Sequence, residues 1–158
     1  MAEESTTQKP LEILVADDES GILRLFSTFF GMNGANVVTA SDGLDAISKY
    51  TARFKAGDPF DAVVTDLNMP GASGAEVTKK VKELSPATQV IAITGYEATK
   101  EYEALTKSLG EQRPEGILPK PITLEDIEHL VSMIRYVREV RVEQPGYRLE
   151  PPLYNRVA

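Results

Sequence analysis

The chain has 158 residues, enough for one domain with its own hydrophobic core, and its 42% apolar content argues against disorder of the whole chain. The net charge of −7 argues against a general nucleic-acid-binding protein, which needs a basic surface. Cysteine is absent and His129 is the one histidine, so any bound metal must be held by oxygen ligands, as Mg²⁺, Mn²⁺ and Ca²⁺ are.

The apolar runs are all of strand length, so no membrane insertion is expected. The polar N-terminus lacks the basic start and apolar centre of a secretory signal. We therefore expect a cytoplasmic protein.

Apolar runs and segments of helical periodicity alternate along the chain. The predicted strands are Leu11–Ala16, Asn36–Ala40, Phe60–Thr65, Gln89–Ile93 and Gly116–Leu118. The predicted helices are Gly21–Met32, Asp42–Lys55, Ala75–Leu84, Ala98–Leu109 and a last one from Thr123 to about Val142. In the second helix, Leu44, Ile47 and Tyr50 are expected on the inner side, and Thr123 is expected to cap the last helix.

This alternation predicts an α/β fold with a five-stranded parallel sheet and helices on both faces. Right-handed crossovers restrict it to a doubly wound topology, for which we adopt the flavodoxin-like strand order 2-1-3-4-5 by analogy. The domain is predicted over 11–143. Residues 1–10 are expected to be a flexible tail and 144–158 a second, proline-containing tail.

Acidic residues follow two strands that such a topology places side by side. Asp17 and Asp18 come after the first strand, and Asp66 comes after the third. Ligands in these folds bind beyond the carboxyl ends of the strands, so the three carboxylates should meet in one site. A divalent cation relieves their mutual repulsion, and Mg²⁺ favours such a site together with waters and a phosphate.

The same edge of the sheet carries the groups needed for phosphoryl transfer. A carboxylate such as Asp66 can attack phosphorus, while the Lys120 ammonium and the Thr94 hydroxyl can contact phosphoryl oxygens. Each residue also has a structural alternative: helix capping for the aspartate pair, a turn for Asp66, and a solvated position for Lys120. Their coincidence at four strand ends favours a functional site.

These residues resemble the receiver domains of two-component response regulators. The resemblance is carried by Asp17-Asp18-Glu19, by the segment from Asp66 to Gly71 with Gly74, by Thr94-Gly95 and by Lys120-Pro121. It covers about Leu11 to Val142. The chain is longer than the family pattern near Ala52–Pro59 and near Glu111–Glu115.

The resemblance implies that Asp66 is the phosphoacceptor and that Asp17, Asp18, Asp66 and the backbone carbonyl of Asn68 hold Mg²⁺. It further implies that Lys120, joined to Pro121 by a cis bond, contacts the phosphoryl group and that Thr94 is the switch hydroxyl. The phosphoryl donor would be a phosphohistidine on a sensor histidine kinase or a phosphotransfer protein. A downstream protein target would then read the change. Such a domain is a signalling phosphoacceptor and not an enzyme acting on a separate substrate.

One position departs from the family pattern. Receivers commonly carry an aromatic residue three places before the lysine, where this chain has Ile117. Tyr96 and Tyr102 are alternative aromatic residues for that role, but a surface location is the prediction for both. Ile117 leaves open a pseudo-receiver that binds partners without phosphorylation. A Mg²⁺-dependent phosphohydrolase is disfavoured, because Asn68 stands where such enzymes often carry a second aspartate.

The last helix carries Arg135, Arg138 and Arg141 at intervals of three. This spacing places them on one side of the helix, where a solvated face or a partner-binding stripe is possible. The solvated face is our prediction.

Overall fold

Five parallel strands form one sheet in the order β2-β1-β3-β4-β5. The computed structural model describes residues 9–148, so most of both predicted tails, 1–8 and 149–158, lies outside the described residues. The strands are β1 (Leu11–Ala16), β2 (Ala35–Ala40), β3 (Ala62–Asp66), β4 (Gln89–Thr94) and β5 (Gly116–Pro119). The helices are α2 (Ser20–Met32), α3 (Gly43–Lys55), α4 (Gly74–Leu84), α5 (Ala98–Leu109) and α6 (Leu124–Glu143), with a short 3₁₀ turn, η1 (Gly110–Gln112).

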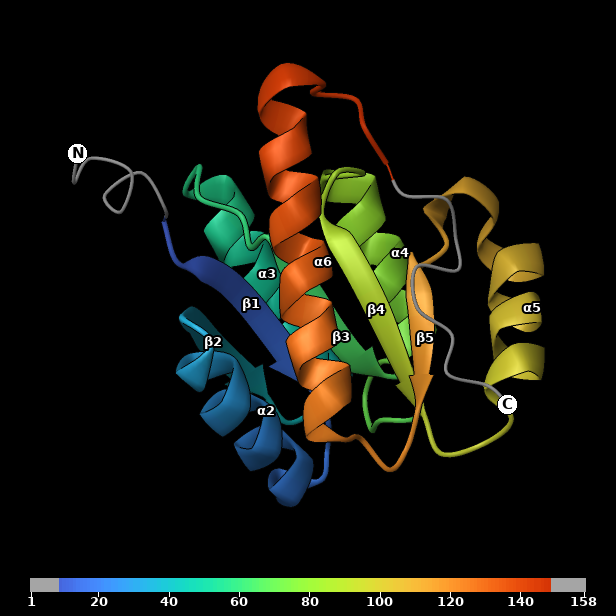
Figure 1. The fold of residues 1–158 in the computed structure, drawn as a ribbon. Helices are drawn as coiled ribbons and strands as arrows, with labels where there is room; N and C mark the ends of the chain where they lie inside the picture. The colour runs from blue at the N-terminus through green and yellow to red at the C-terminus, as the bar shows by residue number, and fades with distance from the viewer. Residues whose placement is uncertain (1–8, 149–158) are drawn as a thin grey trace.

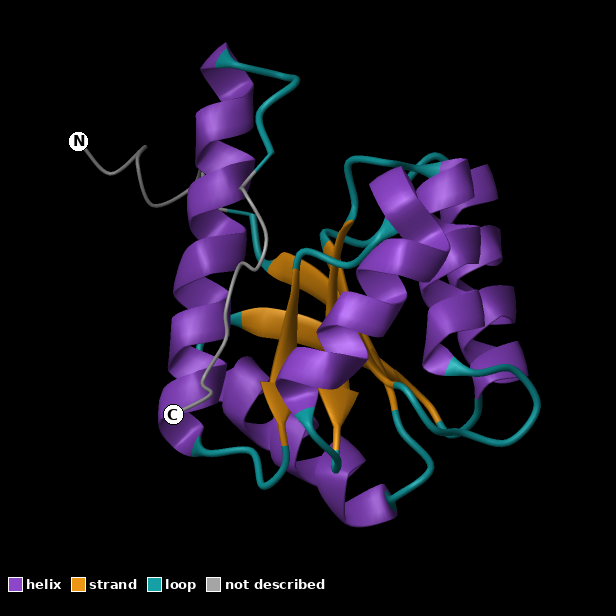
Figure 2. Ribbon diagram, turned by 90° about the vertical axis from the view of Figure 1, so that its right-hand side faces the viewer, coloured by secondary structure: helices purple, strands orange, loops and turns teal. Residues whose placement is uncertain are grey.

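Helices cover both faces of the sheet. Helices α2 and α6 lie on one face, and α3, α4 and α5 lie on the other (Figures 1 and 2). All strands point the same way, so one edge of the sheet collects their carboxyl ends and the opposite edge their amino ends. The predicted α/β class, doubly wound arrangement and strand order are confirmed.

Alternation along the strands builds a core on each face. In β1, Ile13 and Val15 face α2 and α6, whereas Leu14 and Ala16 face α3 and α4. All four side chains are fully buried. Because both faces of β1 are covered, its sequence from Ile13 to Ala16 is a continuous apolar run, which is typical of a parallel sheet.

Reciprocal hydrogen bonds fix the start of α6. The Thr123 hydroxyl accepts a hydrogen bond from the Asp126 N–H, and the Asp126 carboxylate accepts one from the Thr123 N–H. The predicted cap is therefore confirmed. The prediction for Leu44 is wrong: its side chain is 62% exposed and lies against Gly71 of the loop after β3 instead of the core. Tyr50, two turns further along α3, is fully buried as predicted.

The arginine stripe of α6 is not a freely solvated face. Arg135 donates a hydrogen bond to the carbonyl of Asn33. Arg138 donates to the carbonyls of Lys9 and Pro10, and Arg141 donates to those of Ala87 and Tyr147. These arginines therefore fasten neighbouring segments to α6, which corrects the predicted solvated face.

A buried ion pair lies at the amino end of the sheet. Lys82 of α4 is 2% exposed, and its ammonium contacts both carboxylate oxygens of Glu115 at 2.9 and 2.7 Å. Glu115 also accepts hydrogen bonds from the Val90 N–H and from Arg148. Burial lowers the pKa of Lys82, and the neighbouring Glu115 carboxylate opposes that shift. This cluster joins α4, β4, the start of β5 and the segment after α6.

None of the helices within residues 9–148 is long and apolar enough to cross a membrane.

Candidate functional site

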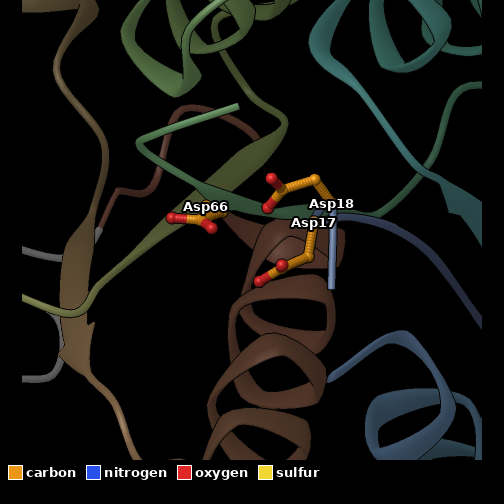
Figure 3. A group of neighbouring side chains, drawn as sticks. All are labelled: Asp17, Asp18 and Asp66. Carbon is orange, nitrogen blue, oxygen red and sulfur yellow. The ribbon is translucent and has the colours of Figure 1, made fainter. Parts of the chain in front are cut away.

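Three aspartates meet at the carboxyl end of the sheet. Asp17 follows β1 and Asp66 ends β3, and these two strands are neighbours. Carboxylate oxygens of Asp17, Asp18 and Asp66 all lie within 4.8 Å of one another. Figure 3 shows the three side chains gathered in one place. Asp17 is fully buried, Asp66 is nearly so, and Asp18 is exposed. The structure thus brings together the three carboxylates that the sequence predicted at one site.

Close backbone packing fixes the loop after Asp66. A Cβ added to Gly74 would lie 2.2 Å from the Asp66 carbonyl oxygen, so only glycine lets α4 begin this close to β3. The Gly74 N–H also donates to the Leu67 carbonyl. Within the loop, the Asn68 N–H donates to Oδ1 of Asp66 at 3.2 Å, which orients that carboxylate. Asn68 itself is exposed at the rim of the site.

Asp17 occupies the least favourable electrostatic position of the three. Burial raises the pKa of Asp17 to about 6, and repulsion from Asp66 adds to the shift, while the Glu19 N–H and Lys120 oppose it. Its Oδ1 accepts the Glu19 N–H at 2.8 Å. Its Oδ2 is buried and 3.2 Å from the Lys120 ammonium, but no donor in the described part of the chain meets hydrogen-bond geometry there. Asp17 thus presents an oxygen without a proper donor to the centre of the site.

Lys120 supplies positive charge from the end of β5. Its backbone N–H donates to the Thr94 carbonyl at 2.7 Å, which holds the residue beside β4, and its bond to Pro121 is cis as predicted. The ammonium lies 2.7 Å from Oε1 of Glu19 and 3.2 Å from Oδ2 of Asp66. Burial lowers the pKa of Lys120, but the bond to Glu19 and the two aspartates outweigh that effect and raise it. Lys120 therefore stays charged at physiological pH.

Thr94 lies deeper than the other predicted residues. Its side chain is fully buried at the end of β4, and its hydroxyl accepts a hydrogen bond from the Tyr96 N–H at 3.0 Å. The adjacent Gly95 and Tyr96 line a shallow pocket of about 410 Å³ together with Asp66 and Lys120. Thr94 is thus behind the pocket wall.

The donor set suits a hard divalent cation. Three carboxylates converge against a single nearby ammonium, so negative charge is in excess among the described residues of the site. The buried Oδ2 of Asp17 has no hydrogen-bond donor among the described residues, so a cation would satisfy it. Oxygen ligands of this kind fit Mg²⁺.

Comparison with known proteins agrees with this geometry. The family model for the response regulator receiver domain matches residues 13–132. The chain belongs to this family. The matched residues include the three aspartates of the site and Lys120.

Individual relatives support the same assignment. The chain is 31% identical over 140 residues to the transcription factor SKN7 of Saccharomyces cerevisiae, covering 85% of this chain and 20% of that protein. It is 27% identical over 120 residues to the autoinducer 1 sensor kinase/phosphatase LuxN of Vibrio campbellii, covering 76% of this chain and 13% of LuxN. A receiver domain structure from Clostridium thermocellum superposes with a TM-score of 0.69 at 28% identity, covering 85% of this chain and 98% of that one. The chain therefore spans a fifth or less of these two curated relatives.

The receiver's unusual Ile117 is fully buried. It packs with Leu67, Ala92 and Leu105 in a cluster between β5 and α5. Tyr96 is 72% exposed, as predicted for a surface aromatic residue. Tyr102 is half-buried and donates a hydrogen bond to the Pro114 carbonyl at 2.9 Å, so its predicted surface location is wrong.

Sequence reasoning missed one contact of the receiver's site. Glu19 entered only as the third letter of an acidic run, yet its carboxylate makes the shortest contact to Lys120. The two residues lie 101 positions apart in the chain, so spacing alone gave no signal of the pairing.

Proposed function

We propose that this receiver accepts a phosphoryl group on Asp66 from a phosphohistidine of a sensor histidine kinase or phosphotransfer protein. The observation that carries the proposal is the Asp66 carboxylate, which is held beside Lys120 at 3.2 Å and within 4.8 Å of Asp17 and Asp18. The relatives that include sensor kinases support a partner of this class. A cytoplasmic location and a switching unit over 11–143 belong to the same proposal.

The chemistry requires little beyond positioning. A carboxylate oxygen of Asp66 attacks phosphorus, and the bond from phosphorus to the donor's imidazole nitrogen breaks, with its electron pair passing to that nitrogen. The Lys120 ammonium stabilises the charge on the phosphoryl oxygens. Asp17, Asp18, Asp66 and the Asn68 carbonyl would hold Mg²⁺, which supplies further stabilisation of that charge when bound.

Thr94 is the group most suited to report the change. Its hydroxyl accepts the Tyr96 N–H, so it is held away from the pocket by a bond of ordinary strength. A phosphoryl group on Asp66 offers acceptor oxygens to which this hydroxyl can donate. Movement of Thr94 would shift the Tyr96 backbone and the start of α5, and a downstream protein would read that surface.

Intact mass spectrometry after incubation with acetyl phosphate tests the proposal. We expect a gain of one phosphoryl group that requires Mg²⁺ and is absent from Asp66→Asn. Asp58→Asn is a matched control, because Asp58 is an exposed aspartate outside the site and the variant should be labelled as the wild type is. Labelling of Asp66→Asn would assign the acceptor elsewhere. No labelling of the wild type would instead favour the phosphorylation-independent binding module to which Ile117 points.

A further inference from the structure

Glu19 holds Lys120 more closely than either aspartate does. The Lys120 ammonium lies 2.7 Å from Glu19 but 3.2 Å from both Asp17 and Asp66. Glu19 is also the most exposed of the three, with 59% of its side chain accessible, whereas the side chains of the two aspartates are almost wholly buried. The shortest contact is therefore made by the side chain that can leave at the lowest cost in desolvation and packing.

The backbone of Glu19 is fixed even though its side chain can leave. Glu19 is the N-cap residue of α2, and its carbonyl accepts the N–H groups of Ile22 and Leu23. Its side chain makes no capping hydrogen bond. The Glu19 carboxylate therefore does not cap the backbone N–H groups of α2, and it contacts Lys120 instead.

The Lys120 ammonium has three N–H donors and three carboxylate neighbours. Two of these carboxylates, Glu19 and Asp66, accept hydrogen bonds from the ammonium, so Glu19 competes with a phosphoryl oxygen on Asp66 for the same cation. We propose that Glu19 is a positioning residue that occupies Lys120 in the unphosphorylated protein and is displaced when Asp66 is phosphorylated. This inference rests on the proposed function, and it adds a competing partner for the cation of that site.

The direction of the effect follows from the competition. A contact that is present before the reaction and lost in the transition state raises the barrier, because only interactions that strengthen in the transition state accelerate a reaction. Removing the Glu19 contact should therefore speed phosphorylation of Asp66. Exposed ion pairs are weak, so the expected gain is about two- to fivefold.

The test compares initial phosphorylation rates with acetyl phosphate at saturating Mg²⁺. Glu19→Gln removes the charge, and Glu19→Asp keeps the charge but shortens the reach. Glu97 gives matched controls, because it too is an exposed N-cap glutamate without a capping bond, and it pairs with Lys100 instead of Lys120. We expect both Glu19 variants to react faster, whereas Glu97→Gln and Glu97→Asp keep the wild-type rate.

A direct readout of the contact accompanies the rates. In the metal-free, unphosphorylated protein, the NMR signal of the Lys120 ammonium should change in both Glu19 variants and stay unchanged in the Glu97 variants. A merely structural role for Glu19 would alter the stability of α2 without moving that signal.

The outcomes separate two failures. If Glu19→Asp reacts at the wild-type rate while Glu19→Gln is faster, net charge and not the contact is responsible, and the inference fails. Unchanged or slower rates in both Glu19 variants also overturn it, and leave the proposed function standing because the wild type is labelled. If the wild type takes up no phosphoryl group, the proposed function itself fails, and the role of Glu19 falls with it.

Discussion

The two ends of the sheet carry charge clusters of opposite balance. At the carboxyl end, Asp17, Asp66 and Glu19 surround the one ammonium of Lys120, with Asp18 nearby. At the amino end, the single carboxylate of Glu115 receives two cations, one from Lys82 and one from Arg148. Both clusters are partly buried, so the difference lies in how completely the charges are matched.

Matching separates a structural cluster from a reactive one. Each carboxylate oxygen of Glu115 has two donors: Lys82 and the Val90 N–H for Oε1, and Lys82 and Arg148 for Oε2. Asp17, by contrast, has a buried oxygen without a proper donor and a raised pKa. A buried charge is tolerated when it is fully paired. The excess negative charge at the carboxyl ends of the strands therefore indicates where a cation and a phosphoryl group can bind.

The largest effect on stability is expected at the amino end of the sheet, where the charges are paired. Replacing Glu115 with alanine leaves the buried Lys82 without its carboxylate and should lower the free energy of unfolding by about 3–5 kcal/mol. Urea unfolding measures the change. Glu83→Ala, on the exposed side of the same helix, serves as the control and should stay near the wild type. A loss below about 1 kcal/mol for Glu115→Ala would mean that the pair is not desolvated as the structure indicates.

Magnesium bound at the carboxyl end of the sheet, where negative charge is in excess, should stabilise the protein. At a Mg²⁺ concentration one hundred times its dissociation constant, the free energy of unfolding should rise by about 2.7 kcal/mol. The gain should be smaller in Asp18→Asn at the same Mg²⁺ concentration, because one carboxylate of the cluster is neutral. Equal gains in the two proteins would place the metal elsewhere. Urea unfolding with and without Mg²⁺ provides the measurement.

Neutralising Asp17 should act in the opposite direction to neutralising Glu115. Because the pKa of Asp17 is raised to about 6, its ionised form destabilises the folded, metal-free protein at neutral pH. Asp17→Asn should therefore raise the free energy of unfolding without Mg²⁺ by on the order of 2 kcal/mol at pH 7.5. A destabilised variant would contradict the comparison between the two ends.

The same residue predicts a pH dependence. The folded state keeps the Asp17 proton up to about pH 6, whereas an unfolded aspartate loses it near its ordinary pKa of 3.8. The stability advantage of the protonated form is therefore complete below about pH 4 and lost as the pH rises through 6. The stability difference between Asp17→Asn and the wild type should be large above pH 6 and vanish near pH 4. Metal-free urea titrations at several pH values test this.

The smallest effect is expected for Arg148. A third of its side chain is exposed, so its contact with Glu115 is screened by solvent. Arg148→Ala should lower the free energy of unfolding by about 0.2–1 kcal/mol, far less than Glu115→Ala. If the two variants lose similar stability, Arg148 and not Lys82 is the main partner of Glu115.

Local patterns predicted the elements and the acidic cluster because both depend on short-range signals. The apolar run of β1 and the Thr123 cap lie within a few residues, and the rule for strand ends places Asp17 beside Asp66. Contacts between distant segments had no such signal. Arg141, for example, was assigned to a solvated face because nothing in its helix indicates that Ala87 and Tyr147 come to it.

A further error and an omission have the same origin. Leu44 fits the helical spacing of an inner residue, but it lies in the first turn of α3, where the loop containing Gly71 is its neighbour. The sequence predicts no role for Glu115, which lies in a segment longer than the family pattern, because that role depends on Lys82, 33 positions earlier. Amphipathic periodicity gives the direction of a side chain relative to its own helix, and not what the rest of the chain brings to it.

Ile117 has a consequence for how change can spread from the pocket. A branched aliphatic side chain has no polar tip that could be satisfied in water, so it gains nothing by turning outward from its place under α5. An on-or-off reorientation of a single side chain is therefore not available at this position. Leu67, next to Asp66, and Ala98, in the first turn of α5, belong to the same packed cluster. A change at Asp66 that passes through this cluster would therefore displace α5 as a rigid body. It would not depend on a rotamer change of one side chain.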